Sequence, residues 1–219
     1  GIDASFFNGK LNLEADWFYK KTNDILRERT DMPAILGYKL PAANVGKVDN
    51  RGIDLNITHR NHLRDFNYSI AGNLTWARNK VIDLLEPAGE KNNPRQRSTG
   101  HSMSQYFGYE ALGLFQSDEE ANNWPQPQFG KAKAGDIKYK DQNGDGIIDA
   151  EDEIAIGRSN YPELVYGLNL NAEWKGFDIT FFFQGAALAD FYYNGYLAFP
   201  YIEGRGGALL EHHIGNTWT

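Results

Sequence analysis

FNYSIAGNLTW, residues 66–76, has the clearest alternation of side chains in the sequence. Side chains alternate through it with a period of two, which is typical of a β-strand with two different faces. One face is apolar or aromatic with one glycine: Phe66, Tyr68, Ile70, Gly72, Leu74 and Trp76. The other is small or polar: Asn67, Ser69, Ala71, Asn73 and Thr75. The stretch therefore predicts a strand between an apolar and a polar environment.

The same alternation returns in four other stretches, at residues 11–20, 51–60, 164–174 and 177–183. The last two are separated only by Lys175-Gly176, so we expect them to form a hairpin. The polar faces are rich in Asn, Thr and Ser, whereas a soluble sheet usually carries Lys and Glu there. We predict an all-β fold built from one antiparallel sheet.

Strand length helps to choose between a soluble sandwich and a membrane barrel. Ten residue steps from Phe66 to Trp76 cover roughly 33 Å, and a tilt near 40° reduces this to about 25 Å across a membrane. That is the height of the apolar band of an outer-membrane barrel, and aromatic residues stand at both ends of the stretch, as its girdles require. A soluble antiparallel sheet with aromatic-rich strands remains the alternative at this point.

The connections differ in length. Residues 8–10, 61–65 and 175–176 are short, whereas residues 27–50 and 82–163 are long. Alternating strand directions put all the short turns on one side, as in bacterial barrels, whose long loops lie outside the cell. Within the long segment, residues 101–115 alternate poorly because Glu110 and Gln105 interrupt the two faces. We therefore expect residues 82–163 to form one extracellular excursion, with 101–115 inside it or facing a partner.

Composition excludes several classes of protein. The chain has 219 residues, a formal net charge of −7 and a sequence pI near 5.2, so it lacks the clustered cations of a nucleic-acid binder. It has no cysteine, which excludes disulfides, thiolate zinc sites and a cysteine nucleophile. We expect residues 1–219 to be part of a single barrel domain and a piece of a longer protein.

DQNGDGIIDAED, residues 141–152, has the spacing of a twelve-residue calcium loop. Oxygen ligands are expected at loop positions 1, 3, 5, 7, 9 and 12, and the turning glycine is Gly146. The six predicted ligands are Asp141, Asn143, Asp145, the carbonyl of Ile147, Asp149 and Asp152. Position 12 is Asp rather than Glu and no helical pattern flanks the loop, so it is nearer to a dockerin-type loop than to an EF-hand sensor. A metal-free Asp/Asn/Gly turn is the alternative.

Signals for catalysis are few. Asp118, Glu119 and Glu120 supply carboxylates, but adjacent acids after a strand usually form a solvated loop or a helix start. His212 and His213 lack the spacing of helical metal ligands, so we expect an exposed pair. No serine nucleophile motif, phosphate loop or zinc signature is present. The sequence predicts that the chain is not an enzyme.

Several blocks together resemble the C-terminal barrel region of SusC/RagA-type TonB-dependent outer-membrane transporters of Bacteroidetes. The blocks occur in the family's order and cover nearly the whole chain: residues 42–57, 66–84, 107–120, 135–157 and 161–185. The resemblance implies a place in a large outer-membrane barrel with long extracellular loops. The plug domain and the closing strands of that barrel are not in residues 1–219.

The resemblance also implies partners. A SusD-like surface lipoprotein would cap the barrel, and TonB would deliver energy through a missing N-terminal region. The cargo would be oligosaccharides or peptides, which suit polar lumen residues such as Asn12, Glu14, Asp54, Asn73 and Asn171 equally. We expect calcium to be structural. The rival interpretation is a secreted, soluble β-rich module for carbohydrate binding or adhesion with one calcium loop.

Overall fold

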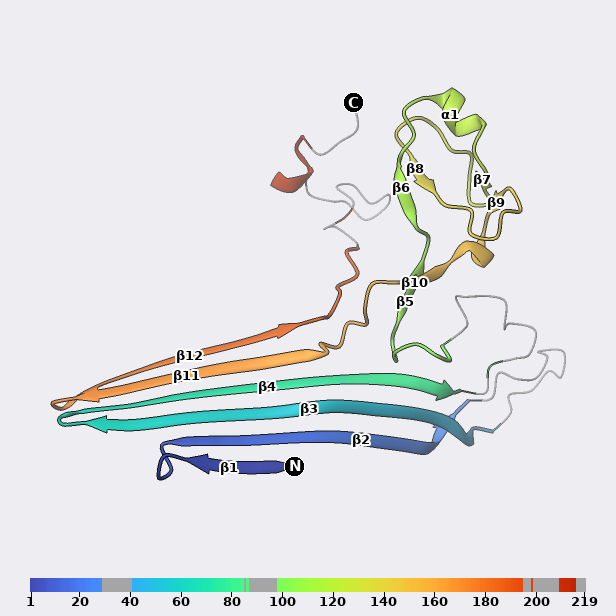
Figure 1. The fold of residues 1–219 in the computed structure, drawn as a ribbon. Helices are drawn as coiled ribbons and strands as arrows, with labels where there is room; N and C mark the ends of the chain where they lie inside the picture. Colours follow the sequence, from blue (N-terminus) through green and yellow to red (C-terminus); the bar gives the residue numbers. More distant parts are fainter. Residues whose placement is uncertain (29–40, 85, 87–97, 195–197, 199–208, 216–219) are drawn as a thin grey trace.

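The computed structural model describes residues 1–28, 41–84, 86, 98–194, 198 and 209–215. Its main feature is a six-stranded antiparallel sheet of order β1-β2-β3-β4-β11-β12 (Figure 1). The strands are β1 (Ile2–Phe6), β2 (Leu11–Arg27), β3 (Ala43–Leu63), β4 (Phe66–Asp83), β11 (Leu164–Trp174) and β12 (Phe177–Ala187). The all-β fold and all five predicted strands are confirmed.

The strand register brings the apolar positions of all six strands to one face. Leu74 on β4 lies opposite Leu55 on β3 and Tyr166 on β11. On its other side, Leu55 lies opposite Ala15 on β2. Two residues along, Gly72 lies between Ile57 and Leu168. Because side chains alternate between faces, every second row across the sheet is apolar.

Within the described residues, no other part of the chain covers the apolar face, and its large side chains are exposed. The exposed fractions of Phe177, Trp17 and Phe183 are 77%, 69% and 56%. A monomer in water rarely exposes a continuous apolar surface of this extent, whereas a lipid-facing barrel wall must expose one. The geometry therefore favours the membrane barrel over the soluble module.

Two strands are longer than their alternation indicates. β2 continues beyond residue 20 to Arg27, and β3 begins at Ala43, so the prediction that all of residues 27–50 form a connection is wrong for 43–50. Pairs such as Lys20 with Asn50 continue the ladder with polar side chains. Backbone pairing needs no apolar face once a strand leaves the lipid, so alternation marks the lipid-facing part of the strand only.

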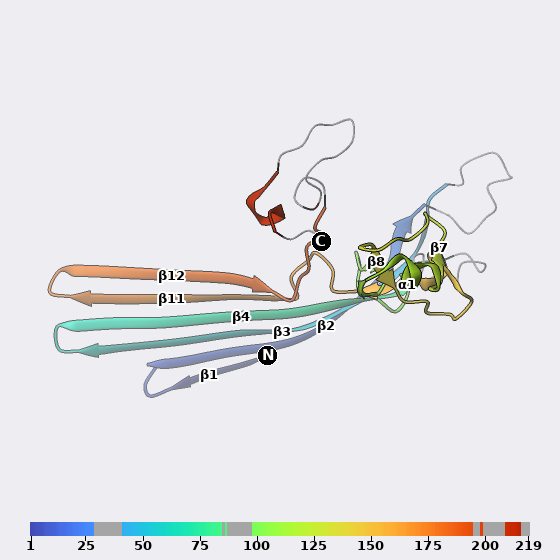
Figure 2. The same cartoon turned by 90° about the horizontal axis from the view of Figure 1, so that it is seen from above.

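The sheet is open, with β1 and β12 at its edges. Figure 2 shows the strands lying side by side, with the turn after β3 and the turn between β11 and β12 at one end and the excursion at the other. The predicted sharing of one side by the short turns is therefore seen. The Lys175-Gly176 turn uses left-handed backbone, with φ of 48° at Lys175 and 84° at Gly176.

The excursion between β4 and β11 forms a small lobe beyond the sheet (Figure 1). β5 (Tyr106–Gly108) pairs with β10 (Ile154–Ile156), and β6 (Ala111–Leu114) pairs with β8 (Ile137–Tyr139). Residues 101–115 thus lie in the excursion, as predicted, and not in the main sheet. The remaining elements are α1 (Asp118–Asn122), β7 (Gln126–Pro127), β9 (Ile147–Ile148) and the 3-10 turns η4 (Ala150–Asp152) and, after β12, η6 (Glu211–His213).

The lobe has its own small core. Phe115, Ala121 and Ala132 are buried together, and Trp124 packs against them with its ring 6.5 Å from that of Phe115. Trp124 Nε1 also donates a hydrogen bond to the carbonyl of Tyr139, at 2.8 Å. No helix in the described part of the chain is long and apolar enough to cross a membrane.

Candidate functional site: the polar sheet face and the acidic loop

The polar face of the sheet carries hydrogen bonds between neighbouring strands. Asn171 Nδ2 donates to Ser69 Oγ at 3.1 Å, and Thr180 Oγ1 donates to Asn171 Oδ1 at 2.8 Å. Asn56 Nδ2 donates to Glu14 Oε2 at 3.4 Å. The predicted lumen residues Glu14 and Asn73 lie in one row with Asn56. These contacts hold the side chains in place while leaving further donors and acceptors available.

A groove of about 650 Å³ lies near the short-turn end of the sheet. Its lining combines two cations, Lys10 and Arg60, with two carboxylates, Glu173 and Asp178, and with neutral groups such as Thr180. Glu173 and Asp178 lie directly opposite one another on β11 and β12. The groove offers many hydrogen-bond partners and both charges, a chemistry that suits a polar ligand or a polar protein surface.

The acidic loop is folded by its own carboxylates. Asp141 accepts hydrogen bonds from the backbone N–H groups of Gly144 and Gly146, at 2.6 and 2.9 Å. Asp145 accepts from the N–H of Ile147 at 2.8 Å. Gly146, the predicted turning glycine, has a φ of +85°, which a residue with a side chain rarely adopts. The loop therefore has the sharp turn that its spacing predicts.

Asp149 and Asp152 close the loop. Asp152 is fully buried, and its two oxygens accept from the N–H groups of Gln142 and Asp149, at 2.7 and 2.9 Å. Asp149 caps η4 by accepting from the N–H of Glu151 at 2.8 Å, and it also accepts from Gln128 Nε2 at 3.2 Å. The chain ends of the loop are thereby held together around one buried charge.

The six predicted calcium ligands all lie on this one loop. Within the described residues, no three His, Cys, Asp or Glu side chains are grouped closely enough to hold a metal ion. Their oxygens accept backbone N–H groups instead, as for Asp141 and Asp152. An oxygen-rich donor set still fits a hard cation such as calcium. Calcium binding therefore stays a prediction.

Of the two alternatives expected for residues 118–120, a solvated loop or a helix start, the structure shows the helix start. Ser117 Oγ accepts from the N–H of Glu120 at 3.1 Å, which is an N-cap, and α1 begins at Asp118. Glu120 pairs with Lys138 at 2.6 Å, and Asp118 accepts from the N–H of Ala134 at 2.9 Å. These carboxylates fasten the helix to its neighbours. Near the end of the chain His212 is exposed, with its Nε2 2.5 Å from Tyr193 Oη.

Two carboxyl groups of the lobe have lowered pKa values. The pKa of Glu110 is lowered first by the hydrogen bond from Gln142 and then by the one from Lys140. The pKa of Glu120 is lowered first by the hydrogen bond from Lys138 and then by the backbone N–H of Gln116. Each favours the charged form of the carboxylate, so these pairs fasten the lobe at neutral pH.

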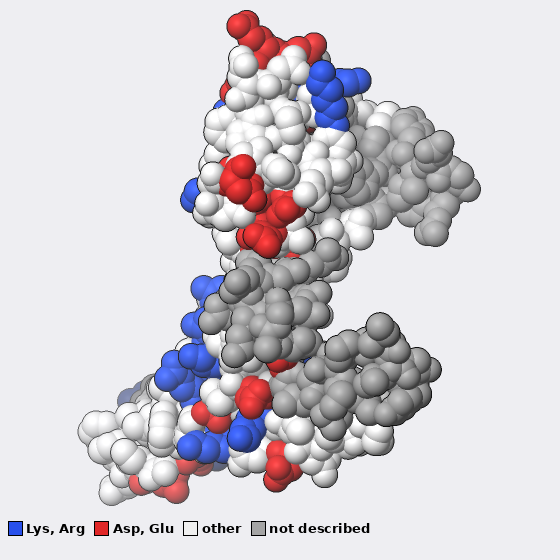
Figure 3. All heavy atoms as spheres, turned by 90° about the vertical axis from the view of Figure 1, so that its right-hand side faces the viewer, with Lys and Arg blue, Asp and Glu red and all other residues white. Residues whose placement is uncertain are grey.

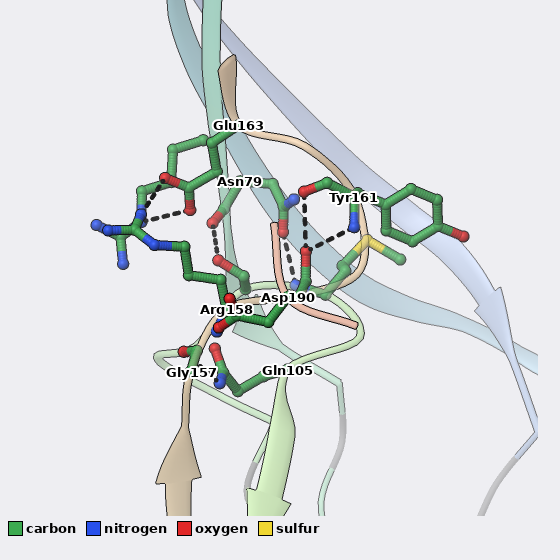
Figure 4. Close-up of polar contacts among 11 residues, drawn as sticks. Asn79, Gln105, Gly157, Arg158, Tyr161, Glu163 and Asp190 are labelled. Carbon is green, nitrogen blue, oxygen red and sulfur yellow. Dashed lines mark hydrogen bonds and ion pairs between the residues drawn. The ribbon is translucent and has the colours of Figure 1, made fainter. Parts of the chain in front are cut away.

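A polar junction joins the lobe to the sheet, and the sequence does not predict it. Figure 4 shows its side chains converging from β4, the start of β5, the segment between β10 and β11, and the segment after β12. Gln105 Nε2 donates to the carbonyls of Ile156 and Gly157, at 2.9 and 3.2 Å. Asp190 accepts from the N–H of Arg158 at 2.5 Å. No short motif signals contacts between residues so far apart in the chain.

Glu163 is the charged centre of this junction. Its carboxylate lies 3.3 Å from Arg78 Nε on β4 and 3.5 Å from Arg158 Nη1 (Figure 4). Only 11% of the Glu163 side chain is exposed, whereas its partners Arg78 and Arg158 are 56% and 44% exposed, so solvent still screens the two ion pairs in part. The junction thus holds the base of the lobe against the end of the sheet.

Comparisons with known proteins agree with this architecture. A family model described as "TonB dependent receptor-like, beta-barrel" matches residues 1–196. TonB-dependent receptor P26 of Formosa agariphila is 33% identical over the whole chain, and SusC of Bacteroides thetaiotaomicron is 24% identical over 99% of it. The chain spans 22% and 21% of the lengths of these two relatives.

Solved structures show the same fold. The RagAB peptide transporter aligns with 83% of this chain and 20% of its own, with a TM-score of 0.61 and 23% identity. An "open-open" state of the RagAB peptide importer aligns with 85% of this chain and 20% of its own, with a TM-score of 0.64 and 22% identity. Together with the apolar and polar faces of the sheet, these matches establish that the chain belongs to the TonB-dependent receptor β-barrel family, of the SusC/RagA type, and is located in the bacterial outer membrane.

Proposed function

We propose that this chain forms six neighbouring wall strands of a TonB-dependent outer-membrane importer. The observation that carries the proposal is the continuous apolar face of the sheet opposite a polar, hydrogen-bonded face. A wall of this kind separates lipid from an aqueous lumen. Its relatives are named as TonB-dependent receptors, and similar folds include a peptide transporter.

The cargo class we propose is oligosaccharide or peptide. The polar face presents amide, hydroxyl and carboxylate groups, such as those of Asn73, Ser69 and Glu14, which bind hydroxyl-rich and peptide ligands alike. A SusD-like surface lipoprotein would cap the barrel on the lobe side. TonB would act through a part of the protein outside residues 1–219. The lobe would lie outside the cell, because long loops of bacterial barrels do so.

Uptake measurements test this function. A strain lacking the full-length protein should fail to accumulate one class of fluorescently labelled cargo, either oligosaccharides or peptides, and the wild-type gene should restore accumulation. Accumulation should stop when the proton motive force is dissipated. Unchanged uptake of both classes in the deletion strain would contradict the importer, and recovery of the protein in the culture medium would favour the secreted module.

A second proposal concerns calcium. The acidic loop would bind one structural calcium ion through Asp141, Asn143, Asp145, Asp149 and Asp152 and the carbonyl of Ile147. Weak affinity would suffice outside the cell, where calcium is near millimolar, roughly 10⁻³ M. The loop's spacing and the turn at Gly146 support the proposal. Bound calcium would neutralise the loop's carboxylates and stiffen the surface at which a capping lipoprotein would meet cargo.

Metal analysis of the purified full-length protein tests the calcium site. One extra calcium ion per molecule is expected relative to Asp145→Ala, and Glu119→Ala serves as the control because Glu119 lies on the same lobe outside the loop. Calcium removal should also speed trypsin cleavage near Lys138 and Lys140. Equal calcium in the wild type and Asp145→Ala, together with unchanged cleavage, would contradict the site.

A further inference from the structure

The apolar face of the sheet ends in a row of large side chains on the lobe side. Trp17, Ile53 and Trp76 lie opposite one another on β2, β3 and β4 in that row. Trp is enriched where the hydrocarbon of a membrane meets its headgroups, so this row marks the level of the interface. Side chains beyond this row on the same face therefore lie at headgroup level.

The next two rows on this face are charged. Tyr19, Arg51 and Arg78 form the first row beyond the tryptophans, and Lys21, Asp49 and Lys80 form the second. Each row is two residues further along the strand, or roughly 6.6 Å, which a tilt near 40° reduces to about 5 Å along the membrane normal. The rows therefore stand about 5 and 10 Å outside the hydrocarbon. Headgroup regions add about 5 to 8 Å to each side of the core, so the first row lies among the headgroups and the second lies just beyond them, within reach of long lysine side chains.

Like charges face each other in the first row, whereas in the second row Asp49 lies directly opposite both Lys21 and Lys80. Arg51 lies directly opposite Arg78, an arrangement that destabilises a sheet unless an anion lies between or near the two side chains. Arg78 is partly compensated by Glu163, and Asp49 accepts a hydrogen bond from the hydroxyl of Tyr19. Arg51 and Lys80 form no ion pair with another described residue. The two rows contain four cations, and two carboxylates face them.

Three of the four cations also share a cavity. A pocket of about 370 Å³ is lined by Arg51, Arg78 and Lys80, with Asp49 as its one carboxylate, and His101, Ser102 and Gln105 supply further polar groups. Segment 98–105 forms its outer wall by pairing with the end of β4, where the N–H of Val81 donates to the carbonyl of His101 at 2.8 Å. Figure 3 shows Lys and Arg side chains gathered on one side of the sheet end, below the lobe.

The four cations of these rows are called here the rim cation cluster: Lys21, Arg51, Arg78 and Lys80. We propose that this cluster binds the phosphate groups of a lipid headgroup in the outer leaflet of the membrane. The cluster is continuous with the lipid-facing wall, so the acyl chains of such a lipid would lie on the apolar face below. Arginine suits phosphate because its planar group donates two parallel hydrogen bonds. A phosphate here would relieve the repulsion between Arg51 and Arg78. The inference rests on the outer-membrane location and on the proposed placement of the lobe outside the cell, and it is independent of the cargo.

Native mass spectrometry of the full-length protein tests the proposal. The probes are diphosphoryl lipid A and the same lipid with both phosphates removed. The phosphorylated lipid should bind more tightly, and the double variant Arg51→Gln/Lys80→Gln should weaken its binding by roughly 25-fold, because each cation near a lipid surface contributes a factor of about five. Lys131→Gln/Lys133→Gln, which removes the same charge from the exposed lobe, should leave binding unchanged.

A variant that removes a negative charge controls for misfolding, because misfolding would weaken lipid binding and could not tighten it. Asp49→Asn keeps an acceptor for Tyr19 while removing the negative charge, so it should tighten binding of the phosphorylated lipid. Equal binding of the two lipids, equal loss in the lobe control, or no response to either rim variant would overturn the proposal. So would displacement of the lipid by millimolar inorganic phosphate, roughly 10⁻³ M, because the site would then be one for a free anion.

Discussion

Asp152 is a predicted calcium ligand and also a buried residue that holds the loop together. Its position in the loop predicts a calcium ligand, and the structure shows a buried carboxylate that holds two backbone N–H groups. A buried charge is tolerated only when it is fully hydrogen-bonded. The loop is therefore closed through this residue by contacts within the chain, and a metal would add to that closure.

The stability of the lobe should depend on pH through Glu120. The pKa of Glu120 is lowered in the folded lobe by Lys138 and the N–H of Gln116, so the folded value lies below the unfolded one. Its contribution to stability is present above the unfolded pKa, about 4.3, and is lost as pH falls through the folded pKa. The urea midpoint of the lobe should therefore fall at acid pH more in the wild type than in Glu120→Gln.

The signal for this measurement is the ¹⁹F resonance of Trp124 in protein labelled with 5-fluorotryptophan, because Trp124 packs on the lobe core. At neutral pH, Glu120→Gln should have the lower urea midpoint, whereas Glu119→Gln should match the wild type. Midpoints of the wild type and Glu120→Gln that differ equally at pH 7 and pH 3 would show that the ion pair does not act through its charge.

At the scale of the strand, alternation carries the functional information. Leu168 faces the apolar side at mid-strand, and its neighbour Asn169 faces the polar side. Leu168→Arg should destabilise the folded barrel by about 2 to 4 kcal/mol, the cost of a cation on the lipid face near the midplane. Asn169→Arg should cost much less, because residue 169 faces the polar side of the sheet, where a cation can stay in contact with water.

Refolding of the full-length protein into lipid vesicles over a urea series measures both variants, with heat-modifiable gel mobility reporting the folded fraction. Equal losses in the free energy of unfolding for Leu168→Arg and Asn169→Arg would mean that the two faces of the sheet meet the same environment. That outcome would contradict a wall between lipid and water.

The same alternation explains what the sequence could and could not predict. Residues 66–76 predict their strand and both of its faces, because a period of two is a local property. The pattern alone left a soluble sheet open as the alternative to a membrane barrel. The extension of β3 back to Ala43 has no such period, since polar residues there lie on both faces outside the lipid. The contact of Gln105 with Gly157 joins residues 52 apart in the chain, and no local pattern encodes it.

The candidate site divides in the same way. The turn at Gly146 follows from short-range rules and was predicted, and the helix start at Asp118 was one of two alternatives that the sequence left open. The rim cation cluster was not, because Arg51 and Arg78 become neighbours only through the register of β3 and β4. Sites formed by residues close together in the chain can be predicted from the sequence. Sites formed by residues on different strands can be found only once the strand register is known.

At the scale of the whole molecule, the sheet and the lobe have different roles. The sheet supplies a wall with lipid on one side, and the lobe stands beyond the wall on a polar junction centred on Glu163 (Figure 1). Open edges at β1 and β12 require neighbouring strands, because unpaired backbone groups are very costly in lipid. The chain therefore completes its structure only within a closed barrel.

Site-directed spin labelling of β4 shows whether one face of this sheet lies against lipid. The chain has no cysteine, so single cysteines at residues 70–76 give a clean background within it. In the full-length protein in vesicles, with cysteines elsewhere replaced, labels at Ile70, Gly72 and Leu74 should collide with lipid-soluble oxygen. Labels at Ala71, Asn73 and Thr75 should be shielded from it. Oxygen accessibility without a period of two along residues 70–76 would contradict the account.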